Sequence, residues 1–289
     1  MRRIVAITVL ALLGVLPLWA QQSETLVFTR IERNPRTAAL AGAGAASVRD
    51  VAYASFQNAA KVTFYAGKAD FAAGYHLWSL EKASSIHAGA AYRLGVVGLS
   101  FGGIYQFNDP ALQLNLGVGA RLAHWLSVGV NLRLAQQTLF PGQAISGFNA
   151  DVMLLARASR SLSFAAGVVN IGNNIKDSYS NDYPQPASLK LAADYLLAFA
   201  RVHTLEFMLD MDYFLFSKGI SLSAGAEYAY NNMLFVRAGY RAASVQTVYP
   251  SHLALGLGFQ FAGVRLEASW LTASQRIGNS LSLGLGYRF

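Results

Sequence analysis

The fold is decided by the segment Leu112-Gln113-Leu114-Asn115-Leu116-Gly117-Val118-Gly119-Ala120-Arg121-Leu122, in which apolar residues alternate with polar or small ones. Successive side chains of a β-strand point to opposite faces, so this pattern predicts a strand with one apolar face and one polar face. The alternation continues over residues 126–134 and returns over residues 251–261. Repetition of the pattern indicates a β-sheet in which one face is apolar along its whole extent.

About fourteen segments carry the pattern, and each has about the length of a tilted strand that crosses a membrane, roughly 9–11 residues. They are residues 69–77, 85–93, 96–105, 111–122, 125–135, 147–158, 161–170, 187–196, 203–212, 219–230, 233–241, 251–261, 263–271 and 280–289. We therefore predict an all-β protein, a transmembrane antiparallel β-barrel of about 14 strands. Alternation leaves the count open between about 12 and about 16.

The composition excludes two other classes of protein. Hydrophobic residues make up 54% of the chain and charged residues 13%, whereas soluble domains are about one quarter charged. After the first twenty residues no apolar run reaches the roughly 20 residues of a membrane-spanning helix.

The chain has no cysteine, which excludes disulfides and thiolate metal sites, and its net charge of +8 comes without a Lys/Arg run. Nucleic acid is therefore not an expected partner.

The connections between the predicted strands alternate in length. Leu94-Gly95, Ala123-His124 and Asn231-Asn232 are very short, whereas residues 135–146 and 170–186 form long connections. Outer-membrane barrels have short periplasmic turns and longer outer loops. We therefore expect a protein of the bacterial outer membrane with lipid around it and, because the strand number is even, with both termini in the periplasm.

The N-terminus predicts export. Met1-Arg2-Arg3 is positively charged, residues 4–16 are apolar, and Leu18-Trp19-Ala20 ends in a small residue, as in a cleaved signal peptide. An uncleaved anchor helix is the alternative. We thus divide the chain into a signal peptide (1–20), an N-terminal segment (21–66) and a barrel (67–289).

The inward-facing positions of the predicted strands collect charges of both signs. An arginine or lysine on the lipid face would cost about 2–4 kcal/mol at the bilayer midplane, so their restriction to one face supports the assignment of faces. Two interpretations stay open, a lumen filled by cross-strand ion pairs or a polar path for a solute. The candidate lumen network comprises Arg121, Arg133, Asp151, Arg157, Lys190, Asp194, Glu206, Asp210, Asp212, Glu227, Arg237, Arg265 and Glu267.

The last predicted strand must pair with the first. Lipid offers no hydrogen-bond partners, so an open sheet edge would leave backbone groups unsatisfied. This strand ends in Tyr287 and Phe289 on the lipid-facing parity. That ending resembles the C-terminal signal of outer-membrane barrels, which implies the barrel-insertion machinery as a partner.

Most of residues 21–66 do not alternate and are rich in glycine and alanine. We expect this segment to plug the barrel, because about fourteen strands enclose more space than side chains fill. It closely follows the signal peptide, so we expect it to begin at the periplasmic end, with Arg33, Arg36 and Arg49 pairing with lumen acids. A flexible periplasmic tail is the alternative. The candidate plug residues are Arg36, Gly42, Gly44, Asp50 and Asn58.

The same segment carries a family resemblance. Residues 35–46, Pro-Arg-Thr-Ala-Ala-Leu-Ala-Gly-Ala-Gly-Ala-Ala, followed by Asp50 and by Phe56-Gln57-Asn58-Ala59-Ala60-Lys61, resemble the N-terminal motif of PorV/PorQ-type barrels of Bacteroidota, part of the FadL-like group. The resemblance implies a fourteen-stranded barrel with an N-terminal plug. It also implies one of two roles: an accessory component of type IX protein secretion, with secretion-system proteins as partners, or transport of small hydrophobic molecules. The charged lumen favours the first.

No motif indicates catalysis. Gly98-Leu99-Ser100-Phe101-Gly102 matches the G-x-S-x-G pattern, but that motif needs a strand–turn–helix elbow and here it lies within an alternating strand. No spacing of histidines or carboxylates suggests a metal site. We therefore expect no enzyme activity, no catalytic residues, no cofactor and no metal.

Overall fold

The structure is a computed structural model that describes residues 26–78, 84–107, 110–140, 143–176, 182–199, 201–244, 247, 250–272 and 279–289. The predicted signal peptide, residues 1–20, lies outside these ranges. No helix in the described part of the chain is both long and apolar enough to span a bilayer.

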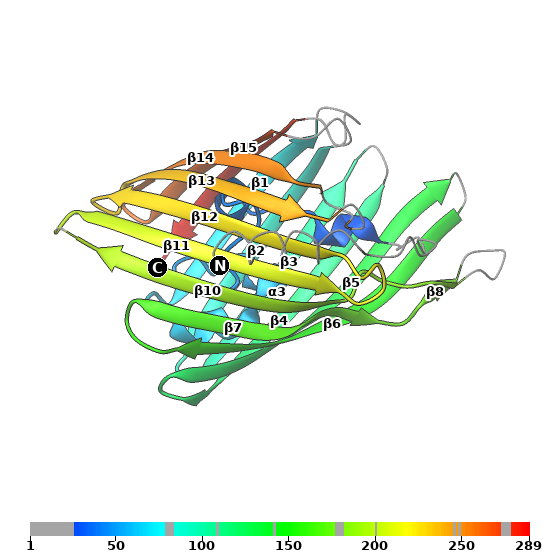
Figure 1. The fold of residues 1–289 in the computed structure, drawn as a ribbon, viewed down its shortest axis with the longest axis horizontal. Helices are drawn as coiled ribbons and strands as arrows, with labels where there is room; N and C mark the ends of the chain where they lie inside the picture. The colour runs from blue at the N-terminus through cyan, green and yellow to red at the C-terminus, as the bar shows by residue number, and fades with distance from the viewer. Residues whose placement is uncertain are drawn as a thin grey trace, which may run out of the picture.

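Fourteen long antiparallel strands in the described residues close into a barrel, which confirms the predicted fold class (Figure 1). The barrel closes where β1 pairs with β16, from Asp70 opposite Arg288 to Trp78 opposite Ser280. The strands are β1 (Ala69–Trp78), β2 (Ser84–Leu94), β3 (Val97–Gln106), β4 (Ala111–Ala123), β5 (Leu126–Phe140), β6 (Gln143–Arg157), β7 (Leu162–Gly172), β10 (Ser188–Ala198), β11 (His203–Phe214), β12 (Ile220–Tyr230), β13 (Leu234–Ala243), β14 (His252–Phe261), β15 (Val264–Thr272) and β16 (Ser280–Arg288).

The two faces of the sheet are as the alternation predicts. On β4, Leu114 and Leu116 are 40% and 49% exposed, whereas Gln113 and Asn115 between them are buried. The apolar side chains thus form a continuous outer belt, and the polar ones point into the lumen. The apolar belt suits a lipid environment. Because the sheet is closed, the backbone N–H and C=O groups of each strand pair with those of its neighbours, and no edge of the described sheet is left unpaired.

One expected loop is wrong. We predicted a long connection over residues 135–146, but β5 extends to Phe140 and β6 begins at Gln143, and the two strands pair Gln136 with Ser146 and Gln137 with Ile145. Backbone pairing needs no apolar side chains, so the ladder extends beyond the point where the alternation ends. The connection after β7 holds an unpredicted small hairpin, β8 (Ile175–Lys176) with β9 (Asp182–Tyr183).

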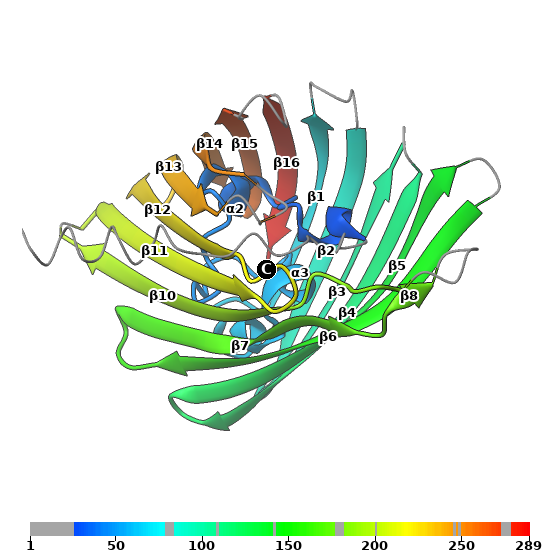
Figure 2. The ribbon, with the colours of Figure 1, turned by 45° about the vertical axis from the view of Figure 1, so that its right-hand side comes forward.

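Residues 26–68, which we call the luminal segment, lie inside the ring of strands (Figure 2). The segment contains η1 (Val27–Arg30), α2 (Pro35–Ala39), α3 (Ala54–Gln57) and η2 (Ala59–Phe64). Helix α2 packs against β13–β16, whereas η2 packs against β2–β6. The segment therefore contacts both ends of the sheet, on either side of the β1–β16 closure.

The luminal segment does not start where we expected. Leu26 and Phe28 are buried in an apolar cluster with Ala135, Ile145 and Ile175, at the end of the barrel that carries the long connections. The expected start was the opposite end, beside the C-terminus. Leu26 and Phe28 bury their apolar surface at the long-connection end, and proximity to the signal peptide in sequence carries no information about that packing.

Glycines in the wall allow the luminal segment to approach closely. A Cβ atom added at Gly129 would collide with the backbone nitrogen of Ala60, and one added at Gly239 would collide with the carbonyl carbon of Leu40. Backbone cannot move aside as a flexible side chain can. The small residues on the lumen face thus match the shape of the luminal segment.

We predict that Gly239→Ala displaces the luminal segment and lowers the free energy of unfolding by about 1–3 kcal/mol, because the new methyl group meets packed backbone. Urea unfolding in vesicles and trypsin sensitivity of the segment measure this. Gly103→Ala is the matched control, since its Cβ would find its nearest atom at 3.4 Å. Equal stability of the two variants would contradict the close packing.

We also predict that Leu116→Arg destabilises the barrel in vesicles by about 2–4 kcal/mol, because Leu116 is at the middle of β4 on the lipid face. Leu116→Phe keeps an apolar side chain and is the control. An arginine variant as stable as the phenylalanine variant would show that this face does not contact lipid.

Candidate functional site

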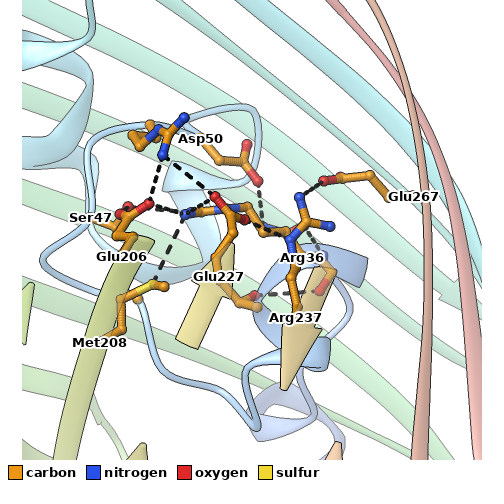
Figure 3. A network of polar contacts seen from close by, with 12 residues as sticks. Arg36, Ser47, Asp50, Glu206, Met208, Glu227, Arg237 and Glu267 are labelled. Atoms are coloured by element: carbon orange, nitrogen blue, oxygen red, sulfur yellow. Dashed lines mark hydrogen bonds and ion pairs between the residues drawn. The ribbon is translucent and has the colours of Figure 1, made fainter. Parts of the chain in front are cut away.

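A network of buried ion pairs joins the luminal segment to the barrel wall. Arg36 lies between Glu206 of β11 and Glu227 of β12, with nitrogen–oxygen distances of 2.9 and 2.8 Å (Figure 3). All three side chains are at most 2% exposed. Ser47 also donates to Glu206, at 2.6 Å. Two residues of the luminal segment thus satisfy one wall carboxylate.

The network continues along the wall. Arg237 contacts Glu227 at 2.6 Å and Glu267 at 3.0 Å, and Arg265 contacts Glu267 at 3.3 Å. Arg265 then reaches Asp70 of β1 and Asp50 of the luminal segment, each at 3.4 Å. The chain of charges therefore crosses the β1–β16 closure, and the luminal segment holds it at both ends, through Arg36 and through Asp50.

Local sequence places Arg36. Asn34 is the N-cap of α2, and its side-chain oxygen accepts the backbone N–H of Arg36 at 3.1 Å. Pro35 follows at the first position of the helix, where its missing N–H costs nothing. The amide of Asn34 donates to Asp50 at 2.9 Å. One short cap thus orients both ends of the network.

Both luminal charges are retained despite burial. Burial by itself would raise the pKa of Asp50, but the guanidinium groups of Arg265 and Arg36 offset this effect and hold that pKa below its ordinary range. Burial also disfavours the charged form of Arg36, whereas Glu227 and Glu206 raise its pKa well above the ordinary value. Removing the charge of Asp50 or of Arg36 would leave its oppositely charged partners buried with less compensation.

A second contact group involves the predicted glycines. Asp210 accepts the backbone N–H of Gly44 at 2.9 Å, and Gly44 has a φ of +134°, which L side chains rarely adopt. Gly42, with a φ of +91°, also has this kind of conformation. Asp212 nearby pairs with Arg30 at 3.0 Å and with Lys190 at 2.9 Å.

Asn58 holds the later part of the luminal segment. Its side chain caps η2 by accepting the backbone N–H of Ala60 at 3.0 Å, and it donates to the carbonyl of Ala45 at 3.0 Å. Lys61, which sequence reasoning did not select, donates to the carbonyl of Gly44 at 3.1 Å. The five selected plug residues therefore lie in one contiguous packed body, although their role as a plug stays a prediction.

Other residues of the predicted lumen network lie apart from the ion pairs of Arg36. Arg133 pairs with Asp151 at 2.9 Å. Arg121 and Arg157 stack on Phe64 at the short-turn end, with their Cζ atoms 4.5 and 5.6 Å from the ring centroid. Asp194 is buried beside Glu206.

The two C-terminal aromatic residues face outward. The rings of Tyr287 and Phe289 pack edge to face at 4.6 Å and are 41% and 65% exposed. Both lie at the short-turn end of the barrel, beside the start of β1.

A cavity of about 80 Å³ lies between the start of the luminal segment and the wall. Its lining is mixed, with Arg30, Glu32 and Asp212 beside Tyr53, Phe56 and Ile104. It has room for several waters, since about 10–15 Å³ of such volume holds one, but it is smaller than the roughly 150 Å³ of an apolar cavity that accepts benzene. Among the described residues no group of three histidines or carboxylates could hold a metal ion.

Comparison with known proteins shows which solved structures share this fold. No family model and no curated relative matches the sequence. The toluene transporter TbuX of Ralstonia pickettii has a TM-score of 0.66 at 14% identity, covering 88% of this chain and 98% of its own. CymD, a monoaromatic hydrocarbon channel, scores 0.65 at 13% identity, covering 92% and 99%. A FadL homologue of Pseudomonas aeruginosa scores 0.56 at 10% identity, covering 89% and 98%. The chain thus has the fold of FadL-like outer-membrane barrels.

We predict that Arg36→Gln lowers the free energy of unfolding by about 3–5 kcal/mol, because it leaves Glu206 and Glu227 buried with one cation fewer. Denaturant titration in vesicles measures this. Arg49→Gln is the control: Arg49 is 24% exposed and lies 3.4 Å from Glu206. If both variants lose the same amount of stability, the burial of Arg36 does not make its ion pairs more important than those of Arg49.

Proposed function

We propose that this protein is an outer-membrane channel for small, largely apolar molecules, in which the luminal segment closes the passage. The observation that carries the proposal is a closed barrel whose lumen holds a packed segment, fixed by Arg36 and Asp50. The short turns and the C-terminus lie in the periplasm, and the long connections lie outside.

The lumen supports a gated passage. The cavity is beside the apolar cluster of Leu26, Phe28 and Ile31 at the long-connection end. Beyond it, α2 and η2 contact the wall, and wall glycines such as Gly129 and Gly239 leave no gap there. A solute therefore passes only if the luminal segment shifts. The ion pairs of Arg36 stabilise the closed arrangement against that shift.

The comparisons favour transport over the secretion role. The structurally similar proteins described above are a toluene transporter, a monoaromatic hydrocarbon channel and a FadL homologue. The resemblance to PorV/PorQ-type barrels made an accessory role in type IX secretion our first expectation, and nothing in these comparisons supports that role. The fold shared with these transport proteins supports the FadL-like alternative, and we propose no enzymatic activity.

We expect the protein to speed uptake of a small aromatic hydrocarbon by intact cells. Toluene crosses phospholipid vesicles unaided, so the assay uses cells with a lipopolysaccharide layer that lack other hydrocarbon channels. Radiolabelled toluene entry should increase when the chain is expressed. Folded protein in the membrane with uptake equal to the empty-vector strain would refute the channel.

We further expect Arg36→Gln to raise ion conductance in planar bilayers, because it weakens the contacts that hold the luminal segment closed. Arg201→Gln is the control, since Arg201 is exposed in the turn between β10 and β11. Unchanged conductance in a folded Arg36 variant would show that the segment does not govern the passage.

A further inference from the structure

Basic side chains gather where β2, β4 and β6 end. Arg93 is the penultimate residue of β2, Arg121 lies near the end of β4, and Arg157 is the last residue of β6. Arg160 follows in the next turn. No aspartate or glutamate occurs in residues 93–98, 119–128 or 154–164, which form these strand ends and turns. The ends of β2, β4 and β6 and the turn after β6 therefore carry four arginines with no acidic residue next to them in sequence, and we call these four the arginine rim.

Two arginines of the rim are held close together. The backbone N–H of Arg121 donates to the carbonyl of Val96 at 2.8 Å, and that of Arg157 donates to the carbonyl of Trp125 at 2.7 Å. Both guanidinium groups stack on Phe64, which is 6% exposed. Cation–π stacking on a buried ring fixes them despite their mutual repulsion.

These guanidinium groups keep donors available. Among the described residues, Arg93, Arg121, Arg157 and Arg160 form no ion pair with a carboxylate. The Nε atoms of Arg121 and Arg157 are buried, so the terminal nitrogens of these side chains are the donors left for a ligand. Within the described residues, the Arg157 side chain makes one hydrogen bond, a long one of 3.5 Å to the carbonyl of Arg160. An arginine fork with free donors matches the oxygens of a phosphate group.

A hollow of about 540 Å³ opens beside Arg157 and Arg160. His124, Trp125 and Ser159 line it, and Trp125 is 46% exposed. The outward-facing Leu122 and Val96, 61% and 60% exposed, lie nearby at the same end of the apolar belt. Basic groups, an indole and apolar side chains thus meet at the height where the strands leave the belt, the usual level of lipid headgroups.

We propose that Arg157 and Arg160 of the arginine rim, which line this hollow, bind the phosphate headgroup of an anionic phospholipid in the adjoining leaflet, such as phosphatidylglycerol. The guanidinium groups contact the phosphate, Trp125 lies at the interface, and the acyl chains pack on Leu122 and its neighbours. A free phosphate ion would use the arginines but not the apolar border, which is why the observations favour lipid. Basic pockets at membrane level recognise anionic lipids by this combination of charge and depth.

The test compares lipid binding by the full-length purified protein. Native mass spectrometry with an equal mixture of phosphatidylglycerol and phosphatidylethanolamine gives the ratio of the two bound lipids. The wild type should prefer phosphatidylglycerol, and each arginine removed, first in Arg160→Gln and then in Arg157→Gln/Arg160→Gln, should lower that preference by about fivefold. Arg201→Gln, at the same end of the barrel but outside the arginine rim, should leave it unchanged.

The heat-modifiable gel shift shows that each variant is folded, and Arg160→Gln changes only an exposed turn residue. Equal preference in wild type and double variant, or an equal loss in Arg201→Gln, would overturn the proposal. A third arm adds inorganic phosphate alone. If it displaces phosphatidylglycerol at comparable concentration, the site takes free phosphate and the lipid assignment is wrong.

Discussion

The charge of Arg36 is the constraint on which the interior depends. A guanidinium group without solvent needs anionic partners, and Glu206 and Glu227 supply them from neighbouring strands. Those carboxylates in turn need Arg36, because they point into a lumen from which the luminal segment excludes most water. Arg237 and Arg265 extend this mutual dependence to Asp70 and Asp50. Breaking a buried pair of this kind is far more costly than its net contribution to stability. The main effect of the network is therefore to fix the position of the luminal segment. Its net contribution to stability is small by comparison.

The outside of the barrel was predictable because its rule is local. A residue two positions away shares the same face, so the alternation around Leu116 identifies a strand and its lipid side without knowledge of its neighbours. The same rule placed Glu206, Glu227 and Arg237 in the lumen. It failed at residues 135–146, because pairing between β5 and β6 continues without any alternation.

The inside was predictable only in outline. Arg36 was selected, but its partners are 170 and 191 residues away in sequence, and nothing local distinguishes Glu206 from the other inward-facing acids. Asn34, Ser47 and Lys61 were missed, although an asparagine before Pro35 is a recognisable helix cap. The path of the luminal segment from one end of the barrel to the other depends on the packing of Leu26 and Phe28, which composition does not reveal.

The route of the luminal segment sets an order on assembly. It precedes β1 in the chain, yet Leu26 lies at the opposite end of the lumen from Phe289, so the finished barrel surrounds it. Threading the segment through a completed ring would move charged residues along the lumen. The shape and charges of the lumen match the segment only at its final position. A simpler sequence of events has α2 on β13–β16 and η2 on β2–β6 while the sheet is still open. We infer that the segment, by contacting strands on both sides of the β1–β16 seam, helps to bring the first and last strands together, with ring closure as the final step of folding.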